Sequence, residues 1–148
     1  MLRWSILKEK IKKMLDKRNV IDFVILFIIT IIISIPLFSN KLDVYCDDGI
    51  QHISRAYGTA KSMQEGNYNI ITDFANDFGY SWNLFYGPLT TYGIIMFELI
   101  FENFIIAYKV LVYVLLLISG LFMYKLVFKI FNNRNVALLS GVIYVLAP

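Results

Sequence analysis

The chain has 148 residues, of which 58% are hydrophobic and only 17% are charged, with a net charge of +3. Soluble domains are typically about half apolar and about a quarter charged, so this composition favours a membrane protein over a soluble globular domain. Cys46 is the only cysteine, which excludes an internal disulfide framework and a zinc site built from several thiolates.

The first segment, residues 1–19, carries seven Lys or Arg and two acids. Such a basic block can bind nucleic acid, but this one directly precedes an apolar run. We therefore interpret it as a cytoplasmic segment that obeys the positive-inside rule. Its apolar residues fall near one helical face, which predicts an amphipathic helix on the anionic inner leaflet: Trp4, Leu7, Ile11, Met14 and Leu15. Membrane lipids, not nucleic acid, are the expected partner.

Residues 20–38, VIDFVILFIITIIISIPLF, hold one charge, Asp22. At 1.5 Å per residue this run can cross a hydrocarbon core of about 30 Å, so it predicts the first transmembrane helix. The run is too long for a signal-peptide core and no small-x-small cleavage site follows it, so we expect it to remain as an anchor.

Residues 39–87 carry six acids and three bases, which predicts an extracytoplasmic loop. A helix is expected over about 48–64, with mainly apolar positions on successive turns (Ile50, Ile53, Tyr57, Ala60, Gln64). A helix of this form would lie on the outer membrane surface. Asp48, His52 and Arg55 share another face at i, i+4 and i+7, and Gly66 and Asn67 are expected to end the helix.

Aromatic residues gather just before Gly87-Pro88, as is typical of side chains at lipid headgroups: Tyr80, Trp82, Phe85 and Tyr86. Pro88 then suits the first turn of a new helix. The apolar run 88–101 is short and contains Glu98, so it predicts a short second transmembrane helix in one of two topologies. Intramembrane acids are costly, which makes Glu98 a further candidate functional residue unless it only marks a helix end.

A third spanning helix is predicted over 104–124, and 137–148 would begin a fourth that the chain does not complete. If 88–101 crosses, Lys125, Lys129 and Arg134 lie outside, against the charge rule. If it does not cross, these bases lie inside. The incomplete last helix leads us to expect that the chain is the N-terminal part of a longer protein.

The segment CDDGIQHISR, residues 46–55, concentrates the reactive side chains. Asp47 and Asp48 could simply cap the helix, and Asp48 could form ordinary surface pairs with His52 or Arg55. Alternatively, a carboxylate just beyond a spanning helix lies near a lipid-linked phosphate. There it could act as a general base or bind a divalent cation that His52 also binds, while Arg55 pairs with a phosphate.

Four stretches then resemble a known family in their order and separation: DDGIQHISR (47–55), GYSWNLFYGPLTTY (79–92), AYKVLVYVLLLISGLFMYKL (107–126) and NRNVALLSGVIYVLAP (133–148). Over residues 20–148 the chain resembles C-type glycosyltransferases. It is most similar to the bacterial polytopic family labelled 6-pyruvoyl-tetrahydropterin synthase-related, although nothing in it resembles a soluble pterin synthase.

This resemblance implies an all-α integral membrane protein, multi-pass in the cell membrane, that transfers a sugar from a polyprenyl phosphate to an extracytoplasmic acceptor. The acid of the first outer loop would serve the acceptor or a divalent metal, a role that falls on Asp47 or Asp48. The spacing to His52, a residue that could share the metal or orient the acceptor, favours Asp48. The family often has Asp-Glu or Asp-x-Asp at this point, and this chain has Asp-Asp. Two alternatives stay open, a non-catalytic module that binds a lipid-linked sugar or a partner subunit, and a transporter fragment.

Overall fold

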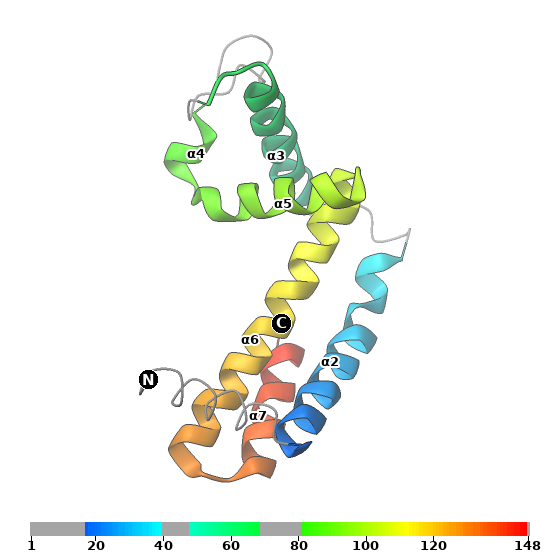
Figure 1. The fold of residues 1–148 in the computed structure, drawn as a ribbon, viewed down its shortest axis with the longest axis vertical. Helices are drawn as coiled ribbons and strands as arrows, with labels where there is room; N and C mark the ends of the chain where they lie inside the picture. The colour runs from blue at the N-terminus through cyan, green and yellow to red at the C-terminus, as the bar shows by residue number, and fades with distance from the viewer. Residues whose placement is uncertain (1–16, 40–47, 69–80, 148) are drawn as a thin grey trace, which may run out of the picture. The chain divides into compact units, whose positions relative to one another are not determined.

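The computed structural model describes residues 17–39, 48–68 and 81–147. Every regular element in these ranges is a helix, which confirms the all-α prediction (Figure 1). The helices are α2 (Lys17–Phe38), α3 (Gly49–Gln64), α4 (Trp82–Phe85), α5 (Pro88–Phe101), α6 (Phe104–Phe131) and α7 (Arg134–Leu146). Two are long and apolar enough to cross a membrane, α2 over Val20–Phe38 and α6 over its full length.

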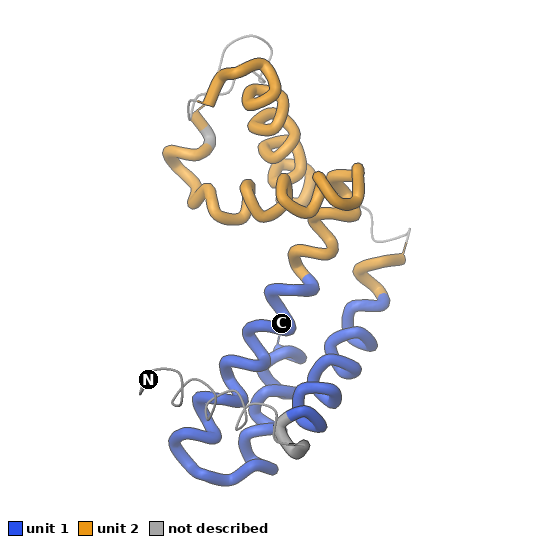
Figure 2. The backbone as a smooth tube through the Cα atoms, viewed as in Figure 1, with its two compact units in different colours: residues 1–35, 113–148 blue, residues 36–112 orange. Residues whose placement is uncertain are grey.

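The chain divides into two compact units (Figure 2). Unit 1 comprises residues 1–35 and 113–148, and unit 2 comprises residues 36–112. The continuous helix α6 contributes its first residues to unit 2 and the remainder to unit 1. The expected helices 104–124 and 137–148 thus correspond to α6, which continues to Phe131, and to α7, which begins at Arg134.

Asparagine side chains cap the two helices that lie next to tight turns. The Asn103 side chain accepts hydrogen bonds from the backbone N–H groups of Ile105 and Ile106 at 2.9 and 3.0 Å, at the start of α6. Asn133 does the same for α7 with Asn135 and Val136. These caps satisfy N–H groups that a helix start otherwise leaves unpaired, so they fix where α6 and α7 begin.

Helix α3 ends at the residues that the sequence predicts. Gly66 has a φ of +79°, its N–H donates to Met63 O, and the Asn67 N–H donates to Ser62 O at 2.8 Å. This pair of bonds is the Schellman arrangement, in which glycine supplies the left-handed residue. The predicted end at Gly66 and Asn67 is confirmed.

Unit 1 packs through small and polar side chains. Helix α2 buries Asp22, Leu26, Thr30 and Ser34, one residue per turn along a single face. Where α6 meets α7, a Cβ on Gly120 would lie 2.5 Å from Val145 Cγ2, and one on Gly141 would lie 3.0 Å from Gly120 O. Helices approach this closely only where side chains are missing, as is common between helices in membranes.

The outer surface of unit 1 is strongly apolar. Ile32 and Ile35 of α2 are 58% and 61% exposed, and Phe122, Ile130 and Phe131 of α6 are similarly open. Water-soluble monomers rarely expose a continuous apolar surface of this kind. A lipid environment or further protein would remove this surface from water.

Unit 2 is built where α3 packs against α5 and the start of α6. Its core is Ala56, Ile94 and Ala107, one residue from each helix, surrounded by half-buried apolar side chains. The buried face of α3 is otherwise small or polar, while Ile50 and Tyr57 stay 47% and 45% exposed. Short side chains therefore bring α3 close to α5 and leave part of its apolar face open.

Candidate functional site

Asp48 occupies the N-cap position of α3 and is exposed. Its side chain makes no capping hydrogen bond, in contrast to Asn103 and Asn133, which cap α6 and α7 through two bonds each. The simple capping role considered for Asp48 is therefore absent. Asp47 and Cys46 lie outside the described residues.

His52 follows Asp48 by one helical turn, and its backbone N–H donates to Asp48 O at 3.0 Å. The half-buried imidazole stacks on Tyr108 of α6, with 6.5 Å between the ring centroids and 14° between the planes. The His52 ring therefore contacts α6, a helix that is distant from α3 in the sequence. The i, i+4 spacing places the Asp48 and His52 side chains on one side of α3.

Arg55 is buried, with 3% of its surface exposed. Its Nη2 donates to Thr91 Oγ1 at 2.8 Å, and its guanidinium carbon lies 5.1 Å from the centre of the Tyr86 ring. Burial lowers the pKa of the Arg55 guanidinium from its ordinary value, and Tyr86 opposes this shift. Arg55 therefore ties α3 to α5 while it carries a desolvated positive charge.

The three predicted residues share a helix but have different surroundings. Among the described residues, no hydrogen bond or ion pair joins the side chains of Asp48, His52 and Arg55. Asp48 is in solvent, His52 lies on an aromatic ring, and Arg55 is inside the α3–α5 contact. The sequence predicts a single face for them, but packing against α5 draws Arg55 inward.

The sequence does not predict the residues that surround Arg55. Thr91 is one of two adjacent threonines in an apolar run, and the aromatic neighbours of Tyr86 predict a position at the lipid headgroups. Nearby in the chain, Asn83 is 9% exposed. Within the described ranges, both atoms of its amide, Arg55 Nε and Thr59 Oγ1 are buried without a hydrogen-bond partner. Such groups are uncommon in folded proteins, so these atoms of unit 2 are available to form hydrogen bonds with a ligand. The only sequence signal for this environment was a threonine and an asparagine among apolar residues.

The two residues predicted as metal ligands, Asp48 and His52, lie one helical turn apart at the start of α3. Within the described residues there is no group of three or more His, Cys, Asp or Glu side chains that could bind a metal ion. Asp48 and His52 alone would supply one carboxylate and one imidazole. Magnesium commonly binds proteins through only one or two carboxylates and completes its shell with water and substrate phosphate. The pair therefore fits a cation shared with a phosphate ligand, and not a closed protein site.

A second polar cluster lies in unit 1 and was also missed. Asp22 of α2, 3% exposed, accepts hydrogen bonds from Arg134 at both carboxylate oxygens, with 2.7 Å between Arg134 Nη2 and Asp22 Oδ1. The Tyr124 hydroxyl donates to the same carboxylate at 2.6 Å. The cluster joins α2, α6 and α7. It brings the start of α2 to the end of α6 and the start of α7.

Comparison with known proteins leaves the family open. No family model matches the chain, and no solved structure matches it. The chain is 26% identical over 133 residues to a protein of Lactococcus lactis subsp. cremoris (strain MG1363) that is described as an uncharacterized protein. The match covers 87% of this chain and 21% of the relative, so the chain spans about a fifth of that protein's length.

Proposed function

We propose that the chain is part of a multi-pass membrane glycosyltransferase that takes a sugar from a polyprenyl phosphate and transfers it to an acceptor outside the cytoplasm. The observation that carries this proposal is Asp48. It is an exposed carboxylate at the start of α3 that does not cap its helix, with His52 one turn away. An exposed carboxylate that is not engaged in a helix cap can act as a general base or as a shared metal ligand.

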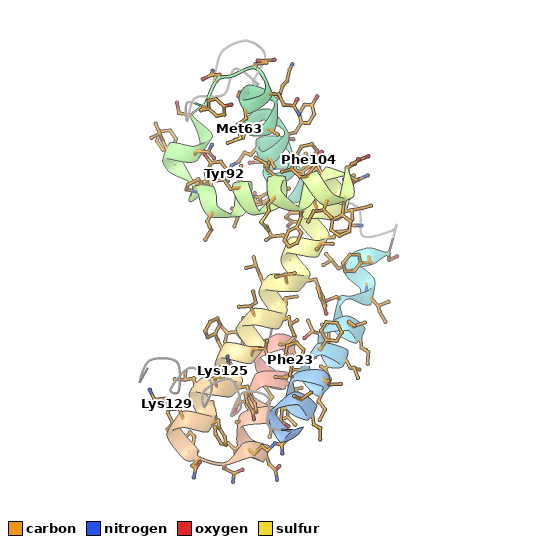
Figure 3. The ribbon with its side chains drawn as sticks, in the orientation of Figure 1. Phe23, Met63, Tyr92, Phe104, Lys125 and Lys129 are labelled. Atoms are coloured by element: carbon orange, nitrogen blue, oxygen red, sulfur yellow. The ribbon has the colours of Figure 1, made fainter. Side chains whose placement is uncertain are left out.

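The proposed topology rests on the unit 1 contacts. Because Asp22 binds both Tyr124 and Arg134, the start of α2 and the end of α6 lie together. If both helices cross the membrane, they cross in opposite directions. Lys125 and Lys129, seen on the last turns of α6 in Figure 3, then lie on the same side as the basic residues 1–19. By the positive-inside rule, the end of the helices that carries these basic residues would be cytoplasmic.

The charge distribution and the length of α5 favour the topology in which 88–101 does not cross. Helix α5 has 14 residues, and at 1.5 Å per residue it spans about 21 Å, less than a hydrocarbon core of about 30 Å. With α2 leading out and α6 leading back, residues 39–103 would lie outside. Helices α3 and α5 and Asp48 would then meet a lipid-linked sugar from the outer side.

In the proposed reaction the Asp48 carboxylate removes the proton of the acceptor hydroxyl. The acceptor oxygen then forms a bond to the anomeric carbon of the sugar. The bond from that carbon to the phosphate oxygen breaks, and polyprenyl phosphate leaves with the electron pair. His52, held by Tyr108, orients the acceptor. Arg55 acts mainly as a positioning residue, because Thr91 already occupies one of its nitrogens.

Asp48 could instead act as a metal ligand with His52. A divalent cation bound there would neutralise the phosphate as it leaves. The two roles differ in one measurement, since EDTA abolishes transfer if Asp48 acts through a cation and leaves it unchanged if Asp48 acts as the base.

The test is sugar transfer from a polyprenyl-phosphate donor by membranes that express the whole open reading frame. Asp48→Asn keeps the size of the side chain and removes the charge, so we expect transfer to fall by about 10²–10⁴-fold. Glu65→Gln, an exposed acid at the other end of α3, is the matched control and should retain activity. Asp47→Asn, compared at equal expression, shows whether the neighbouring acid shares the role.

Wild-type transfer by a normally folded Asp48→Asn protein would remove Asp48 from the mechanism. The non-catalytic binding module would instead be supported by two results together: the wild type binds the donor but transfers no sugar, and Asp48→Asn loses donor binding.

A further inference from the structure

A small hollow in unit 2 lies apart from Asp48. It has a volume of about 190 Å³, and α3, α5 and the first residue of α6 line it: Tyr57, Ala60, Lys61, Gln64, Glu98 and Phe104. A buried water needs only about 10–15 Å³, so the hollow has room for several waters or for one small polar ligand. Phe104 is labelled in Figure 3 beside the end of α5.

Two opposite charges line this hollow without pairing. Lys61 comes from α3 and Glu98 from α5, and the described residues provide no ion pair for either of them. Gln64 lies three residues after Lys61, so both project from the same side of α3. The α3 wall of the hollow therefore carries the Lys61 ammonium and the Gln64 amide, and the α5 wall carries the Glu98 carboxylate.

An aromatic pair completes the lining. The Tyr57 and Phe104 rings meet edge to face, with 5.5 Å between their centroids and 80° between their planes. Aromatic faces attract ammonium groups, as does the carboxylate of Glu98. The Lys61 and Gln64 donors suit an anion with several acceptor oxygens, such as a phosphate.

We propose that this hollow binds a small zwitterion that carries a phosphate and an ammonium group, as in a phosphoethanolamine headgroup. The phosphate contacts Lys61 and Gln64, and the ammonium lies between Glu98 and the Tyr57–Phe104 pair. The source is either a phospholipid of the surrounding membrane or a free phosphoethanolamine group. The proposal does not depend on sugar transfer, because it uses none of the residues assigned to that reaction.

The experiment uses the purified full chain in detergent, freed of lipid. In the first arm, soluble O-phosphoethanolamine is titrated by NMR, with glycerol phosphate as the probe that lacks the ammonium. In the second arm, native mass spectrometry compares retention of phosphatidylethanolamine and phosphatidylglycerol. Saturable binding in the first arm shows that the free zwitterion suffices. Selective retention in the second arm alone identifies the lipid as the source, and either result supports the site.

Matched variants locate the binding. We expect Glu98→Gln and Lys61→Gln each to weaken it about tenfold, the effect of losing one charge-assisted contact. The control for the acid is Glu102→Gln, which changes an exposed acid four residues later, and the control for the base is Lys129→Gln on α6. Because Lys61 is exposed, its variant tests the site even if Glu98→Gln folds poorly. Equal binding of glycerol phosphate, equal losses in the control variants, or no saturable binding in either arm would overturn the proposal.

Discussion

Asp22 in unit 1 and Arg55 in unit 2 are equally buried, at 3% exposed each, but they are satisfied in different ways. Asp22 meets an oppositely charged guanidinium and a hydroxyl, which use both of its oxygens. Arg55 meets a threonine hydroxyl and an aromatic ring, and its Nε keeps no partner among the described residues.

This difference distinguishes polar side chains that hold helices together from polar side chains that could bind a ligand. A buried charge with a complete set of partners fixes helix positions but has no capacity left for a ligand. The Asp22 cluster of unit 1 fits this description, since its carboxylate binds Arg134 and Tyr124. Elsewhere in the described part of unit 1, Ser34 Oγ and Tyr113 OH are buried without a hydrogen-bond partner. Unit 2 has unpaired polar atoms, an exposed acid at Asp48 and opposite charges around a hollow. We therefore expect changes in unit 1 to affect stability, and changes at the polar sites of unit 2 to affect ligands.

The largest effect should come from Asp22→Ala. It leaves Arg134 and the Tyr124 hydroxyl without their shared acceptor at the junction of α2, α6 and α7. The thermal midpoint of the reconstituted protein should fall by about 5 °C or more, because the half-exposed Arg134 guanidinium and the Tyr124 hydroxyl both lose a charge-assisted partner. Asp22→Asn should lose less and Tyr124→Phe least. An unchanged midpoint for Asp22→Ala would remove the structural contrast between the two units.

Gly120→Ala should have the next largest effect. The added methyl group would lie 2.5 Å from Val145 Cγ2, so α6 and α7 must separate or Val145 must shift. Overpacking of this kind costs about 1–3 kcal/mol. Gly87→Ala is the control, because a Cβ there meets nothing within 4 Å. Chemical denaturation of both variants tests whether the α6–α7 contact is as close as described, and equal stability would show that it is not.

Thr91→Val should have a smaller effect on stability. It removes the acceptor of the Arg55 Nη2 hydrogen bond without changing the shape of the side chain much. We expect a loss of about 1 kcal/mol, since a buried donor is left unpaired. Thr90→Val changes the exposed neighbour and should be nearly neutral. If the two variants are equally stable, Arg55 has another partner and does not tie α3 to α5 through Thr91.

Local signals in the sequence predicted the longer helices, but not the short helix α4 or the contacts between helices. The pattern of residues 48–64 and the pair Gly66-Asn67 depend on nearby residues, so the position and end of α3 could be derived. The Asp22–Arg134 pair joins residues 112 positions apart, and the Arg55–Thr91 bond joins residues 36 apart. No periodicity within one helix contains such information. For this reason Asp22 looked like an isolated charge, and Arg55 looked like a surface residue.

The arrangement on which the proposed function depends is tested most directly by the accessibility of two engineered cysteines. In a protein with Cys46→Ser, Gln51→Cys places a thiol on the exposed side of α3, and Asn135→Cys places one in the first turn of α7. With a membrane-impermeant maleimide on intact cells, we expect Gln51→Cys to be labelled directly and Asn135→Cys only after permeabilisation. Labelling of both cysteines from the same side, or the reverse pattern, would contradict the account.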